Sequence, residues 1–126
     1  MVSNLTADHI AVFVDRGYPD QTTRQGLERI MALKSEITAM DRDLGAIEDK
    51  RKQIFKDQKR LRENLQGLGK TARKKDLRNR YIQRLNGQET RLEEMARDEK
   101  GLKQDRKTKQ AQSNDLIANL EQDPES

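Results

Sequence analysis

The stretch from Leu65 to Lys75 reads Leu-Gln-Gly-Leu-Gly-Lys-Thr-Ala-Arg-Lys-Lys, and it decides how the rest of the chain is arranged. Gly67 and Gly69 can each adopt the left-handed conformation that closes a helix, and Thr71 offers a hydroxyl to the free N–H groups of a following helix. A long charged segment with regularly spaced apolar residues lies on either side. We therefore predict that the chain turns back here and forms a helical hairpin.

Apolar residues on both sides of this turn are spaced alternately three and four apart, as at the a and d positions of a heptad. We call them the seam residues; they include Ile37, Met40, Leu44, Ile47, Ile54, Leu61 and Leu65, then Tyr81, Leu85, Leu92, Met95 and Leu102. Continued past the turn, the first series would reach Ile82 rather than Tyr81. This slip of one residue fits neither a stutter nor a stammer of a continuous coiled coil. The pattern thus favours a hairpin over one long helix that dimerises in parallel.

The composition limits the fold to long, thinly packed helices. The 126 residues are 32% hydrophobic and 38% charged, against roughly 45 to 50% and about 25% in ordinary globular chains. A thick core is excluded, and we expect at most one domain. There is no cysteine and no apolar run near the length of a membrane span. The first residues lack the basic start and apolar run of a signal peptide. The sequence assigns no compartment, and the cytoplasm is only a default expectation.

The predicted fold is all-α: a long antiparallel coiled-coil hairpin with a short N-terminal helix packed at its base. Residues 1–19 would form that helix and a linker, although the β-branched run near Val14 leaves a strand as the alternative. Residues 20–122 would form the hairpin, with arms over 20–67 and 71–122 and a turn near 67–71. Residues 123–126 would be a frayed tail.

If the chain turns near Lys70, seam residues whose numbers add up to about 142 should face each other. This register places Leu44 by Glu99 and Met40 by Leu102. At the base it brings Leu27 and Met31 near an apolar group that comprises Leu116, Ile117 and Leu120.

Several seam positions carry polar residues instead of apolar ones. They are Arg51 and Gln58 in the first arm, and Gln88, Glu99, Arg106, Lys109 and Ser113 in the second. In an isolated hairpin such side chains can extend to water along their apolar stems. In a homodimer, a second copy of the arm could pair Glu99 with Arg51 or Arg106 and so set the register. The thin core favours the dimer.

No combination of residues predicts catalysis. Gly67 to Thr71 looks like the end of a phosphate-binding loop, but Asn64 stands where that loop needs glycine, and no buried strand precedes it. The single histidine, His9, cannot form a zinc site of the usual type without cysteines. Because no nucleophile, base and orienting group occur together, we predict a protein that is not an enzyme and has no metal or cofactor.

The region around the turn is strongly basic. From Lys56 to Arg84 there are eleven basic and three acidic residues, a net charge of +8 in a chain whose total is +4. The candidate anion-binding or partner-binding tip comprises Lys70, Arg73, Lys74, Lys75 and Arg78. A basic end attracts phosphates or acidic surfaces, although a solvated arm tip is the simpler interpretation. We expect the nearby aromatics Phe55 and Tyr81 to pack in or beside the seam, which leaves no platform for stacking bases.

Three blocks, Ile54–Leu65, Leu77–Tyr81 and Gln88–Leu92, resemble the helical C-terminal region of large uncharacterised bacterial proteins of the mucoidy-inhibitor-like class. In that class the region follows a β-rich domain of unknown function. The resemblance implies a coiled-coil accessory region and no catalytic residues. The turn in that class is more acidic than Lys70–Lys75.

These observations together predict a non-enzymatic interaction or spacer module of a larger bacterial protein. Its partner would be another protein, including a second copy of itself. The alternative is a helical arm that binds nucleic acid through the basic tip. Steep salt dependence would distinguish phosphate binding from apolar packing.

Overall fold

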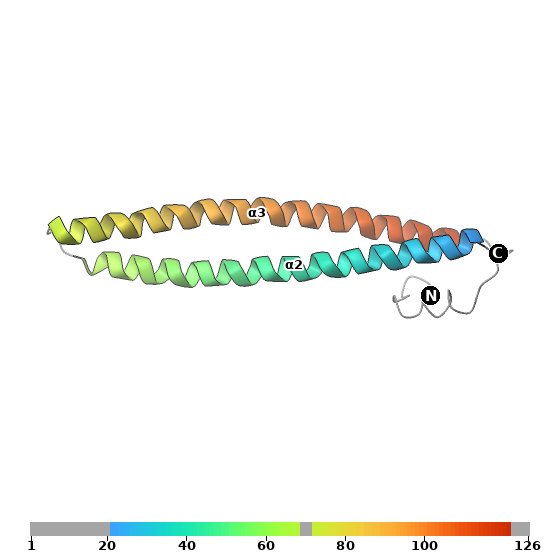
Figure 1. Cartoon of the computed structure of the whole chain (residues 1–126), viewed down its shortest axis with the longest axis horizontal. Helices are drawn as coiled ribbons and strands as arrows, with labels where there is room; N and C mark the ends of the chain where they lie inside the picture. Colours follow the sequence, from blue (N-terminus) through green and yellow to red (C-terminus); the bar gives the residue numbers. More distant parts are fainter. Residues whose placement is uncertain (1–20, 69–71, 122–126) are drawn as a thin grey trace. The chain divides into compact units, whose positions relative to one another are not determined.

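The protein is an all-α helical hairpin. The computed structural model describes residues 21–68 and 72–121, with side chains over 21–68 and 74–120, and contains two long helices (Figure 1). Helix α2 spans Gln21–Gln66 and helix α3 spans Ala72–Glu121. The sequence predicted arms over 20–67 and 71–122. The short N-terminal helix predicted within 1–19 and the tail at 123–126 lie outside the described residues.

The end of α2 differs from the predicted glycine cap. The Gly67 N–H still donates to the carbonyl of Glu63, four residues back, at 3.3 Å, so Gly67 continues the helical hydrogen-bond pattern. Leu68 N then donates to Leu65 O at 3.3 Å, which tightens the last turn. Gly67 does not adopt a left-handed conformation. That part of the prediction is wrong, and Gly69 and Thr71 lie outside the described residues.

The contacts divide the chain, which was expected to be one domain, into two compact units. The described part of the first unit comprises residues 21–43 and 102–121. Its core is Leu27, Ile30 and Ile117, with Met31, Leu116 and Leu120 packed against them. This cluster confirms the apolar group predicted at the base. Leu33 and Ile37 are buried on the same stripe of α2.

The second unit comprises residues 44–101. Here α2 and α3 again lie side by side and antiparallel (Figure 1), but the seam is less apolar. Leu61 and Met95 are buried, and so is the polar side chain of Gln58. A two-helix seam with polar members buries less apolar area per turn, so less hydrophobic free energy holds this unit together.

Most of the cross-helix bonds join residues whose numbers add up to more than the predicted 142, by three for Asp57 with Gln88 and by eight for Arg51 with Glu99. Glu99, predicted to lie by Leu44, bonds to Arg51 in the second unit. In the first unit Arg106 bonds to Asp41, which lies five residues closer to the turn than the predicted register allows. A heptad pattern identifies the face that each helix buries, but the stagger along the axis depends on how the turn joins the helices.

Candidate partner-binding surfaces

The seam residues lie between the helices. Of the twelve named apolar members, Ile37, Leu61 and Met95 are buried and the other nine are half-buried. Each polar member is also at least half-buried. The heptad spacing therefore identified the buried face of both helices, including the positions at which polar side chains enter it.

Arg51 and Glu99 form a cross-helix ion pair in the second unit. Arg51 Nη2 donates to Glu99 Oε2 at 2.7 Å, and Arg51 Nη1 donates to Glu48 Oε2 at 2.6 Å. The hydrogen bond to Glu99 raises the pKa of Arg51, so the guanidinium stays charged. The sequence interpretation considered this pairing only with a second copy of the arm, as an alternative to side chains that extend to water; the structure forms it within one chain.

Asp57 organises a second cross-helix cluster in the same unit. Arg60 Nη2 lies 2.7 Å from Asp57 Oδ1, and from the other helix Gln88 Nε2 donates to Asp57 Oδ2 at 2.6 Å. Arg84 Nη2 lies 3.1 Å from the same Oδ2 atom. The hydrogen bond from Arg60, then that from Gln88 and the charge of Arg84, hold the pKa of Asp57 below its usual value despite some desolvation. Next to this cluster, Gln58 Nε2 donates to Glu89 Oε1 at 3.0 Å.

Ion pairs between α2 and α3 also occur in the first unit. Arg106 Nε and Nη2 donate to the two carboxylate oxygens of Asp41 at 2.5 and 3.2 Å, a bidentate pair. The hydrogen bond from Arg106 lowers the pKa of Asp41 and raises that of Arg106. Lys109 Nζ lies 3.1 Å from Glu36 Oε2. The buried Oγ of Ser113, another polar seam residue, has no hydrogen-bond partner among the residues that the structure describes.

The sequence interpretation missed the acidic members Asp41 and Asp57. Asp41 directly follows the seam residue Met40, and Asp57 directly precedes the polar seam residue Gln58. In coiled coils, the residues that flank the seam form ion pairs between the helices. An acid next to the seam on one arm and an arginine on the other arm could therefore have predicted these pairs.

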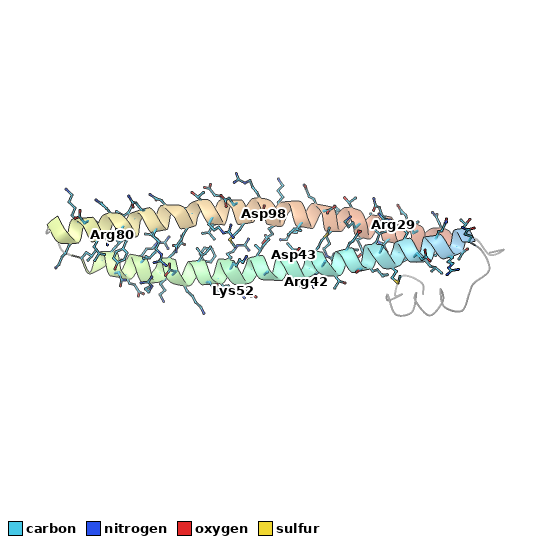
Figure 2. All side chains as sticks on the ribbon, in the orientation of Figure 1. Arg29, Arg42, Asp43, Lys52, Arg80 and Asp98 are labelled. Carbon is cyan, nitrogen blue, oxygen red and sulfur yellow. The ribbon has the colours of Figure 1, made fainter. Side chains whose placement is uncertain are left out.

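The basic tip is described only in part. Lys74 and Lys75 are exposed at the start of α3, and Arg78 is half-buried. Lys70 and the side chain of Arg73 lie outside the described part of the chain. Charged side chains also project along both helices, among them Lys52, Arg80 and Asp98 (Figure 2).

The expected position of one aromatic residue is wrong. Phe55 was predicted to pack in or beside the seam, but it is 52% exposed. Phe55 directly follows the seam residue Ile54. Because successive residues of an α-helix are rotated by about 100° around the helix axis, Phe55 points away from the seam. Tyr81 is half-buried, in agreement with its seam position.

Over residues 21–68 and 72–121, no group of three or more histidines, aspartates or glutamates is arranged to hold a metal ion. Neither of the two helices carries an apolar stretch long enough to cross a membrane.

The fold and the paired seam together define a helical hairpin whose two arms are joined by polar contacts within a single chain. No protein-family model, curated protein or solved structure matches the sequence.

Proposed function

We propose that this protein is a non-enzymatic interaction and spacer module, built as an antiparallel coiled coil, that associates with other proteins. The observation that carries the proposal is the intrachain pairing of the polar seam residues, above all Arg51 with Glu99 at 2.7 Å. A hairpin whose charged seam residues pair across its own two helices leaves the outer faces of both helices available to a partner. The resemblance to the mucoidy-inhibitor-like class supports the same role, as an accessory region of a larger bacterial protein.

The partner surface that we propose lies around Phe55. This side chain is large, aromatic and half exposed on an otherwise charged arm, and aromatic residues are enriched in protein interfaces. A homodimer formed through the outer face would bury Phe55. It would not require the seam to open, because Arg51 and Glu99 already have each other as partners.

Sedimentation velocity of the chain over micromolar concentrations tests this proposal. We expect a monomer–dimer equilibrium that Phe55→Glu shifts to monomer. Ala46→Glu is the matched control, since it adds the same charge at an exposed position of the same helix. A chain that remains monomeric throughout, or a dimer that Phe55→Glu leaves intact, would contradict self-association.

A second candidate function is nucleic-acid binding through the basic tip. It is supported by the exposure of Lys74 and Lys75 and by the charge of the second unit, which has seventeen basic and ten acidic residues. Replacing Lys70, Arg73, Lys74 and Lys75 with glutamine should abolish salt-sensitive binding to a labelled oligonucleotide. Unchanged binding would exclude the tip as the contact.

A further inference from the structure

An open groove of about 310 Å³ lies on one flank of the second unit, away from the tip. Both helices line it: Lys50, Gln53 and Asp57 come from α2, and Arg84, Gln88 and Arg91 from α3. Most of these residues directly precede a seam position, and this spacing brings them to the same side of an antiparallel pair of helices. The groove is thus a consequence of the hairpin and would not exist on either helix alone.

The charge of the groove is positive, and its single carboxylate is already neutralised. Asp57 accepts hydrogen bonds from Arg60 and Gln88 and pairs with Arg84. Lys50 forms no hydrogen bond or ion pair with any residue that the structure describes. Arg91 has only a long contact, 3.7 Å, with the exposed Glu94. Lys50 and Arg91 therefore face the groove with their charges largely available to a ligand.

The lining also provides neutral hydrogen-bonding groups. Gln53 is exposed at the edge of the groove, and Gln88 has a buried Oε1 atom that lacks a hydrogen-bond partner among the described residues. Its Nε2 group meanwhile donates to Asp57. Because this Oε1 atom is buried, Gln53 is the amide of the lining that a ligand can reach.

The shape and chemistry of the groove select the kind of ligand. A protein partner needs apolar anchors in desolvated pockets, but Ile54 is the sole apolar residue of the lining. Arg84 and Arg91 are separated by seven residues of α3, or about 10 Å along the helix, so the positive charge follows the helix instead of surrounding one point. Cations in a line, together with amides, suit an extended phosphate backbone.

We propose that this flank groove binds the phosphodiester backbone of nucleic acid, independently of its base sequence, with Lys50, Arg84 and Arg91 as the phosphate contacts. The inference rests on the second candidate function for the class of ligand only, and it places the contact on a different surface.

The test is fluorescence anisotropy of the whole chain with a short labelled single-stranded RNA. The groove variant carries Lys50→Gln, Arg84→Gln and Arg91→Gln. The control variant carries Lys52→Gln, Lys59→Gln and Lys100→Gln, which remove the same charge from exposed positions of the same two helices outside the groove. Between about 50 and 200 mM salt, the plot of log K against log salt should be less steep for the groove variant than for the unmodified chain. The magnitude of its slope should be smaller by about 2, because each of the three lost phosphate contacts contributes roughly 0.7.

In low salt, the affinity of the groove variant for the RNA should be about tenfold lower than that of the control variant, or lower still. Since Arg84→Gln also removes an ion pair with Asp57, a second variant with only Lys50→Gln and Arg91→Gln keeps that pair and should show most of the loss. Equal losses in the groove and control variants would overturn the proposal, because diffuse charge would then explain the binding. Absence of binding by the unmodified chain would overturn it as well.

Two further arms separate this inference from its alternatives. If the four-residue tip variant loses binding while the groove variant keeps it, the second candidate function stands and the groove assignment is wrong; the reverse result supports the groove and excludes the tip. If polyglutamate displaces the RNA and binds as tightly, and the same groove residues are needed, the groove recognises acidic protein and the proposal is wrong.

Discussion

Arg51 Nη2 and Glu99 Oε2 lie 2.7 Å apart across the two helices, although the residues are 48 positions apart in the sequence. Each side chain is 22% exposed, so the pair is partly shielded from water and from salt. It lies at a seam position on both helices, where an apolar residue would be the default. A charged pair in this position is favourable in one register only, because a shift along the axis separates the two groups.

A double-mutant cycle should show that Arg51 and Glu99 are energetically coupled. Arg51→Ala and Glu99→Ala should each lower the melting temperature, because each removes the bond that joins the two helices at this partly shielded position. The double variant should lose less than the two single variants together. Circular dichroism melts in low and high salt provide the measurement. The exposed pair Arg24 and Glu28, 3.6 Å apart on one helix, is the control and should show almost no coupling; equal coupling in both pairs would contradict the role of the seam.

The apolar core of the first unit should dominate the stability of the chain. Ile30 is 0% exposed and packs in the cluster with Leu27 and Ile117. Ile30→Ala should therefore lower the free energy of unfolding by about 2 to 5 kcal/mol. The same substitution at Ile82, which is 42% exposed, should change it by no more than about 0.5 kcal/mol. Urea denaturation followed by far-ultraviolet ellipticity measures both. Similar losses at the two sites would mean that Ile30 is not in a core.

Three glycines inside the helices can be replaced with a gain in stability. A Cβ atom built at Gly45, Gly87 or Gly101 meets nothing within 4 Å, and none of the three has a left-handed backbone. Alanine at each site should raise the free energy of unfolding by roughly 0.4 to 1 kcal/mol, because it restricts the unfolded chain and costs nothing in the folded one. Ala46→Gly, at an exposed helical position, should have the opposite sign. A loss of stability on Gly45→Ala or Gly87→Ala would contradict the prediction, because it would show that the added methyl group meets other atoms.

Acid should weaken the contacts of Asp57 with Arg60, Arg84 and Gln88. The pKa of Asp57 is lowered in the folded chain, chiefly by the hydrogen bond from Arg60, so folding favours the ionised form. The resulting stabilisation is fully present above the unfolded pKa, near 3.9, and is lost as the pH falls through the lower folded value. Asp57→Asn should therefore lower the melting temperature at neutral pH, and the difference from the unmodified chain should shrink and vanish as the pH falls through the folded pKa of Asp57.

The matched control for this titration is Asp49→Asn, which removes an exposed acid from the same helix. Its effect on the melting temperature should be small across the whole range. A difference between Asp57→Asn and the unmodified chain that persists in strong acid would mean that the aspartate acts through packing instead of charge.

The periodicity of the sequence was sufficient to predict the helices and the face that each one buries. Leu61 and Met95 are buried as predicted, and even the polar Gln58 and Ser113 lie where the heptad placed them. The axial register could not be predicted in the same way. It depends on how residues 67–71 join the helices and on which long side chains meet, and neither is encoded in the spacing of apolar residues.

The surfaces were harder to predict than the seam. Phe55 was expected beside the seam because it is aromatic, but its position one residue after Ile54 turns it outward. The flank groove was not recognised in the sequence, because Lys50 and Arg91 come together only when the two arms are paired. The acids that join the helices were overlooked because isolated Asp residues among lysines and arginines look like ordinary solvated charges.

The two helices pair within one chain in the register in which Arg51 meets Glu99. Since the chain has no cysteine, Lys52→Cys and Lys100→Cys place two spin labels next to this pair, at exposed positions. Double electron–electron resonance should give a short distance, set by helix axes about 10 Å apart and the label arms, that persists when labelled chain is diluted with unlabelled chain. A distance near 70 Å, as along one continuous helix, or a short distance that disappears on dilution, would contradict the intrachain hairpin.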